Sequence, residues 1–176
     1  SHASITEVPN YMEQAAVGFL VQQEVERLGR LVKSPERPFV AILGGAKVSD
    51  KIGVIDSLSR RCDTLMIGGA MAYTFLKAQE QEVGISRVES ERLLLAKRLL
   101  ERCADRGVEV LLPVDHVVAE ALSEDAETQI VTEIPENTMG LDIGPETVAA
   151  YGAKIAAAKV VFWNGPMGVF EMDGDK

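Results

Sequence analysis

The stretch FVAILGGAKVSDK, residues 39–51, decides the fold class of this chain. Its first five residues are all apolar, and so short an apolar run is typical of a strand buried on both faces of a parallel sheet. Gly44 and Gly45 close the strand, and the mixed polar and apolar residues after them predict a helix over 50–60. A strand, a glycine turn and a helix in this order begin a βαβ unit.

The same pattern recurs along the chain. Further buried strands are predicted at 64–67, 108–112 and 160–163, and further helices at 70–79, 89–106 and 145–158. Two shorter apolar runs, 116–119 and 129–134, could pair as a hairpin or form a small extension. Strands that alternate with helices predict a doubly wound, mainly parallel α/β sheet with helices on both faces, a Rossmann-like three-layer arrangement.

A separate region precedes the sheet. Apolar residues recur there at helical spacing and predict one long amphipathic helix over 10–32, which a capping box at Asn10 and Glu13 would open. We therefore expect a helical region over residues 1–33 and a sheet domain over residues 34–176.

Composition excludes several classes of function. The chain has 18 basic and 27 acidic residues, a net charge of -9, which argues against binding to nucleic acid or to anionic lipid. No apolar run approaches the roughly 20 residues of a membrane span, and no signal peptide opens the sequence. Two cysteines without metal-ligand spacing exclude a structural zinc cluster and favour a reducing, cytoplasmic location.

The glycine turns predict a ligand site, because parallel sheets bind ligands outside the carboxyl ends of their strands. After Gly44 and Gly45, Lys47 and Lys51 lie four residues apart at the start of the predicted helix, where free backbone N–H groups can also face an anion. This pattern favours a phosphate site, and the alternative is a tight turn with solvated lysines. Neither a Walker A loop nor a GxGxxG fingerprint occurs.

Other candidates have weaker signals. Small residues at 68–70 could admit a flat ring such as adenine, or could serve close packing of helix on sheet. Residues 140–145 are predicted as a turn before a helix, and Glu171 could bind ribose hydroxyls or be a surface glutamate. Asp115 and His116 are neighbours that point to opposite faces of a strand, so we predict structural roles for both.

Five motifs taken together resemble the phosphoglycerate kinase family. They are GGAKVSDK (44–51), IGGAMAYTFLK (67–77), LPVDHVVA (112–119), MGLDIGP (139–145) and WNGPMGVFE (163–171), in the family's order from about residue 15 to 172. The resemblance implies the nucleotide-binding domain of a two-domain glycolytic kinase that moves a phosphoryl group between ATP and 3-phosphoglycerate. Residues 10–32 would resemble the interdomain helix.

The resemblance also implies roles for single residues. Lys47 would steady the phosphoryl group during transfer, and Lys51 would hold the nucleotide phosphates. The adenine pocket would be lined by Gly45, Gly69, Ala70, Gly140 and Leu141, completed by Asn164, Pro166 and Val169, with Glu171 on the ribose. Ala70 replaces a glycine that is common in the family.

Two departures from the family pattern bear on function. The GGGD[ST] motif, which supplies the family's magnesium aspartate, does not occur before Lys176, and the domain that binds 3-phosphoglycerate is absent. We therefore expect an internal fragment, with its sheet incomplete at the C-terminal end, that is inactive by itself and meets Mg²⁺ through the phosphates of ATP or ADP. The alternatives are a non-catalytic nucleotide-binding or interaction module of the same fold, and a nicotinamide dehydrogenase, against which the absent GxGxxG counts.

Overall fold

The computed structural model describes residues 7–169 of the chain, which divides into two compact units, Ser1–Pro35 and Glu36–Lys176. The first unit contains a 3₁₀ turn, η1 (Val8–Tyr11), and one helix, α2 (Phe19–Lys33). The prediction of a single helix over 10–32 is therefore wrong at its start. Gly18 is the N-terminal boundary of α2, because its carbonyl accepts the hydrogen bond from Gln22 N (3.1 Å), and glycine is a tolerated cap.

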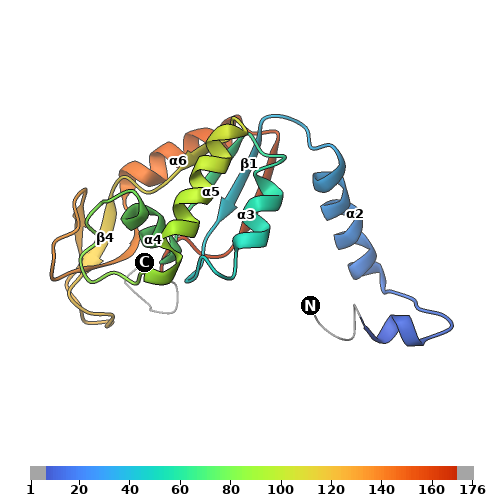
Figure 1. Cartoon of the computed structure of the whole chain (residues 1–176), viewed down its shortest axis with the longest axis horizontal. Coiled ribbons are helices and arrows are strands. Elements are labelled where there is room, and N and C mark those ends of the chain that lie inside the picture. Colours follow the sequence, from blue (N-terminus) through green and yellow to red (C-terminus); the bar gives the residue numbers. More distant parts are fainter. Residues whose placement is uncertain (1–6, 170–176) are drawn as a thin grey trace. The chain divides into compact units, whose positions relative to one another are not determined.

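The second unit is built on a four-stranded parallel sheet with the order β3-β2-β1-β7 (Figure 1). Its strands are β1 (Phe39–Leu43), β2 (Thr64–Ile67), β3 (Glu109–Leu111) and β7 (Val160–Asn164). All five residues of β1 are buried, as expected for an inner strand with helices on both sides. The predicted parallel sheet is confirmed, but the burial predicted for its outer strands is wrong. Strands β3 and β7 are partly exposed because they lie at the two edges of the sheet.

Helices cover both faces of this sheet. They are α3 (Ile52–Leu58), α4 (Met71–Ala78), α5 (Leu93–Asp105), which follows the 3₁₀ turn η2 (Ser90–Arg92), and α6 (Pro145–Ala157). Val40, Ile42 and Met66 share one face of the sheet and pack against Tyr151 of α6. Figure 1 shows α3 and α5 on the other side of β1. The three-layer prediction is thereby confirmed.

A small antiparallel sheet with the order β5-β4-β6 adjoins these layers. Its strands are β4 (His116–Ala119), β5 (Gln129–Val131) and β6 (Met139–Ile143). The hairpin of β4 and β5 was predicted, whereas β6 lies where we expected a turn. Gly140 is needed inside β6 because a Cβ atom there would lie 1.9 Å from the Tyr73 hydroxyl oxygen, so this glycine marks close packing instead of a reversal of the chain.

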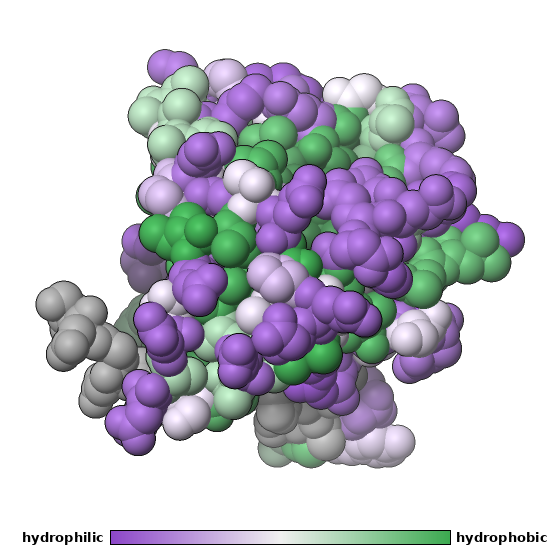
Figure 2. All heavy atoms as spheres, turned by 90° about the vertical axis from the view of Figure 1, so that its left-hand side faces the viewer, coloured by the Kyte–Doolittle hydropathy of each residue, from purple (hydrophilic) through white to green (hydrophobic). Residues whose placement is uncertain are grey.

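The surface around the small sheet offers no continuous apolar face in the view of Figure 2, where hydrophobic side chains are broken up by hydrophilic ones. Leu122 and Ile130 are among its exposed apolar residues. Single exposed apolar residues of this kind are ordinary on protein surfaces. Within residues 7–169, no helix is both long enough and apolar enough to cross a bilayer.

Asp115 has the structural role that we predicted. Its carboxylate accepts hydrogen bonds from the backbone N–H groups of Glu146 and Thr147 (both 2.8 Å) and from the Thr147 hydroxyl (2.5 Å). It thus caps the N-terminus of α6, where Gly144 contributes no side chain. Burial opposes ionisation of Asp115, but these hydrogen bonds outweigh it and hold the pKa below its usual value.

We expect Asp115→Asn to lower the free energy of unfolding by about 1–3 kcal/mol at neutral pH, because buried N–H groups of α6 lose a charged acceptor. Since the folded pKa is lowered, this contribution is present above about pH 4 and is lost as the pH falls through the folded value. Urea unfolding of wild type and variant at pH 7 and pH 3 measures both effects. The exposed Asp125→Asn is the control, and an equal loss at both pH values would contradict the ionic cap.

Candidate functional site

The ends of three neighbouring strands meet in backbone contact. Gly44 N donates a hydrogen bond to Asn164 O (2.9 Å), Gly45 N donates to Pro166 O (3.1 Å), and Gly69 N donates to Met167 O (2.6 Å). The loop after β7 therefore lies across the carboxyl ends of β1 and β2. This is the edge at which parallel sheets bind ligands.

Glycine is required where these backbones cross. Gly69 has φ +67°, and a Cβ atom on it would lie 2.6 Å from Gly45 N. A Cβ atom on Gly44 would lie 1.9 Å from Pro166 O. The glycine pairs that we predicted at a ligand site therefore also allow two backbone segments to pack in direct contact.

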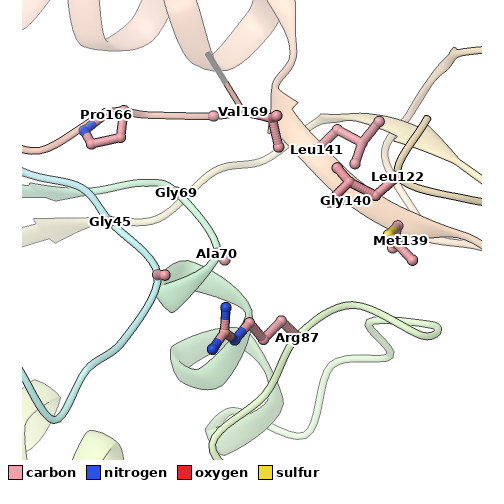
Figure 3. A pocket seen from close by; sticks show the side chains of 12 residues that line it. Gly45, Gly69, Ala70, Arg87, Leu122, Met139, Gly140, Leu141, Pro166 and Val169 are labelled. Atoms are coloured by element: carbon pink, nitrogen blue, oxygen red, sulfur yellow. The ribbon is translucent and has the colours of Figure 1, made fainter. Parts of the chain in front are cut away.

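A cavity of about 370 Å³ opens beside these crossings (Figure 3). Its lining is mostly apolar or without side chains, and comprises Gly45, Ala46, Gly69, Ala70, Arg87, Leu122, Met139, Gly140, Leu141, Pro166, Gly168 and Val169. The β6 wall is tied to the loop after β7 by the hydrogen bond from Val169 N to Leu141 O (2.9 Å). A pocket of this size and character suits a flat, largely apolar group.

The structure brings seven of the predicted site residues together in this cavity. They are Gly45, Gly69, Ala70, Gly140, Leu141, Pro166 and Val169. Lys47, Lys51 and Asn164 lie outside its lining, and Glu171 lies outside the described residues. The cavity therefore joins motifs that are up to 124 positions apart in the sequence, from Gly45 to Val169.

Five lining residues were not among the predicted site residues: Ala46, Arg87, Leu122, Met139 and Gly168. Arg87 and Leu122 come from connecting loops that carried no recognisable signal. Figure 3 shows the Arg87 side chain directed toward Gly45 and Ala70, which lie on the turns after β1 and β2, so a positive charge borders an otherwise apolar pocket. Met139 directly precedes Gly140 in one of the five motifs, and a methionine in that position is typical of pocket or core packing.

The two lysines lie in the turn between β1 and α3. Because α3 begins only at Ile52, the helical spacing predicted for Lys47 and Lys51 is wrong. Lys47 is exposed, and the Lys51 ammonium donates a hydrogen bond to Asn164 Oδ1. Lys51 Cε lies 3.7 Å from the position of a Cβ atom on Gly45, so this side chain borders a residue of the cavity.

Glu89 occupies part of the anion site that the sequence predicted. Its carboxylate accepts hydrogen bonds from Val48 N, from Ser49 N (3.2 Å) and from the Ser49 hydroxyl (2.6 Å). Burial opposes the ionisation of Glu89, but these hydrogen bonds lower its pKa overall. The expectation of free N–H groups in this turn is therefore wrong for Val48 and Ser49.

A buried layer of polar side chains backs the β6 wall. The Tyr73 and His116 rings lie 5.5 Å apart between centroids, and His116 Nδ1 is buried without a hydrogen-bond partner in the described part of the chain. Burial raises the pKa of Asp142, whose carboxyl group fills the space beside Gly168. We assign this layer to packing of the wall, because these side chains are absent from the cavity lining.

We expect Gly140→Ala to destabilise the unit by about 1–3 kcal/mol and to weaken ligand binding in the cavity, because the new methyl group meets the Tyr73 ring. In a double-mutant cycle with Tyr73→Leu, the double variant should lose less stability than the sum of the losses in the two single variants. Thermal unfolding measures the cycle. Gly152→Ala is the matched control, since nothing lies within 4 Å of that helical position, and additive losses would contradict the clash.

Comparison with known proteins identifies close relatives. The model of the family described as phosphoglycerate kinase matches residues 1–175. The phosphoglycerate kinase of Anaeromyxobacter sp. (strain K) is 56% identical over 173 residues, which are 97% of this chain and 44% of that protein. That of Chlorobium chlorochromatii (strain CaD3) is 49% identical over 175 residues, 98% of this chain and 44% of that protein. The chain thus spans less than half the length of these relatives.

Solved structures show the same similarity. Phosphoglycerate kinase from Coxiella burnetii matches with a TM-score of 0.88 and 42% identity, covering 94% of this chain and 43% of that one. The enzyme from Pyrococcus horikoshii OT3 matches with a TM-score of 0.68 and 28% identity, covering 89% of this chain and 40% of that one.

Proposed function

The chain belongs to the phosphoglycerate kinase family, and from this premise we propose that its second unit is the nucleotide-binding domain of a kinase that transfers a phosphoryl group between ATP and 3-phosphoglycerate. The family resemblance predicted from five motifs is thereby confirmed. The observation that carries the proposal is the apolar cavity at the carboxyl ends of the strands, with Lys47 and Lys51 on the adjoining turn.

In this proposal the adenine ring occupies the cavity between the Gly69–Ala70 turn and β6. Small residues on one side and Leu141 and Val169 on the other leave a slot for a flat ring. Asn164 orients Lys51 toward the nucleotide phosphates through the hydrogen bond to Oδ1, and Pro166 shapes the loop beneath them. Glu171 is assigned to the ribose hydroxyls on the strength of its motif.

Lys47 and Lys51 carry the chemistry that this unit would supply. The acceptor is a carboxylate, already ionised at neutral pH, so transfer needs no general base. Catalysis then consists of alignment and of neutralising the charge that spreads over the moving phosphoryl group. Lys47, exposed on the turn, is proposed to stabilise that charge, while Lys51 binds the phosphates of ATP and ADP.

Magnesium is the remaining cofactor of the proposed reaction. Among residues 7–169, no group of three or more His, Cys, Asp or Glu side chains is placed to hold a metal ion. Mg²⁺ usually binds through one or two carboxylates together with substrate phosphates, and we derive no step through it. We propose that Mg²⁺ arrives bound to the nucleotide phosphates.

The proposal extends to the rest of the enzyme. We assign 3-phosphoglycerate binding to another domain, and residues 1–33 to the helix that links the two domains, which leaves residues 34–176 as the nucleotide domain. A cytoplasmic location is supported by two free buried cysteines, Cys62 and Cys103. The net charge of -9 argues against nucleic acid and anionic membrane as partners.

Binding to the isolated chain tests the assignment of the cavity. We expect ADP to bind weakly and NAD to bind no better than background, because the cavity holds one flat ring and the chain lacks the dinucleotide fingerprint. Calorimetric titration of the 176-residue chain with ADP, and competition by NAD, measure this preference. Equal affinity for both ligands would contradict the assignment. Turnover by the complete enzyme separates a kinase from a non-catalytic nucleotide-binding module.

A further inference from the structure

Glu89 connects two segments that are about 40 residues apart in the sequence. Its carboxylate accepts hydrogen bonds from the backbone of Val48 and Ser49 and from the Ser49 hydroxyl, directly after Lys47. We propose that Glu89 is a positioning residue that fixes the turn carrying Lys47 for phosphoryl transfer, an inference that rests on the proposed function. No motif in the sequence pointed to it.

Glu89 is itself anchored to the walls of the cavity. Its backbone N–H donates to the Thr74 hydroxyl (3.1 Å), and Thr74 is buried in α4, the helix that begins beside Ala70. Three residues earlier, the Ser86 hydroxyl accepts a hydrogen bond from Gly140 N (2.9 Å) of the β6 wall. Segment 86–89 therefore links the adenine side of the site to the lysine turn.

The position of Lys47 depends on this link. Within residues 7–169 the exposed Lys47 side chain has no hydrogen bond or ion pair, so the backbone of the turn sets its position. The next residue, Val48, has a fully buried side chain, and its N–H donates to Glu89. Elsewhere in the turn, the hydrogen bond from Lys51 N to Val48 O (2.9 Å) fixes Lys51 relative to Val48 but does not tie the turn to the cavity.

The negative charge of Glu89 also affects where anions can bind on the turn. A phosphate could use the N–H groups of Val48 and Ser49 only by displacing a carboxylate that is already bound there. The carboxylate therefore keeps anions off this part of the turn and leaves their contacts to the lysine ammonium groups. Misplacement of a catalytic group by about 1 Å is enough to cost on the order of 100-fold in rate.

The test compares Glu89→Ala and Glu89→Gln with Glu91→Ala in the complete enzyme. Glu91 is an exposed glutamate in η2 and serves as the matched control. We expect kcat to fall at least about tenfold in Glu89→Ala while the KM for ATP changes less than about threefold, because alignment matters most in the transition state. Glu89→Gln, which keeps one acceptor oxygen, should lose less.

Hydrogen exchange separates this role from the proposed function. The N–H groups of Val48 and Ser49 should exchange at least about tenfold faster in Glu89→Ala, while those of β1 keep their protection. Faster exchange with kcat unchanged would overturn the positioning role, and so would a raised KM for ATP at unchanged kcat. A wild-type enzyme without kinase activity would instead overturn the proposed function. If Glu89→Ala unfolds, the same criteria apply to Glu89→Gln.

Discussion

Purified by itself, the 176-residue chain should transfer phosphoryl groups at less than about one-thousandth of the rate of the complete enzyme. Phosphoryl transfer requires the donor and acceptor oxygens in line and near contact, and this positioning supplies roughly 7–11 kcal/mol of the rate enhancement. In our proposal the acceptor is held by another domain, and the chain spans less than half the length of its relatives. The proposed nucleotide site alone cannot replace that contribution.

A coupled assay on the purified chain, with the complete enzyme at equal concentration as the control, measures the difference. ADP binding to the same preparation shows that the chain is folded and that its cavity is intact. Turnover within a thousandfold of the control would mean that the acceptor site lies within these 176 residues. The assignment of 3-phosphoglycerate to another domain would then be wrong.

The sheet could be predicted from the sequence because its strands carry an unambiguous local signal. Run 39–43 is wholly apolar and run 64–67 is apolar after Thr64, and both end at glycine pairs, so burial on both faces and the position of the turns follow from the residues alone. For strand β6 the local sequence predicted a turn instead of a strand. Gly140 resembled a turn residue, and only the Tyr73 ring, 67 positions earlier in the sequence, explains why a glycine stands in a strand.

Part of the candidate site could likewise be predicted from the sequence, and part could not. Glycine turns at strand ends could be found by pattern, and seven of the predicted residues line one cavity. Arg87 and Glu89 could not be found, because their importance arises from contacts that the fold creates between distant segments. The helical placement of Lys47 and Lys51 failed for a related reason, since α3 begins at Ile52 and a carboxylate from far along the chain holds the N–H groups of the preceding turn.

Lys47→Ala in the complete enzyme should lower kcat by about 100- to 1000-fold, the usual cost of removing one donor that stabilises transition-state charge. The KM for ATP should change by less than about threefold, because the exposed Lys47 side chain lies outside the cavity lining and, in our proposal, acts mainly in the transition state. Lys51→Ala should differ by weakening ATP binding as well, since Lys51 borders the cavity beside Gly45 and is oriented by Asn164.

Steady-state kinetics with ATP varied at saturating 3-phosphoglycerate separate the two lysines. Lys97→Ala, an exposed lysine on α5, controls for the loss of one positive surface charge and should retain full activity. An interaction made only in the transition state lowers kcat and kcat/KM equally, whereas one made equally with bound substrate changes KM alone. If Lys47→Ala altered only the KM for ATP, its charge would serve ground-state binding, and the roles proposed for Lys47 and Lys51 would have to be exchanged.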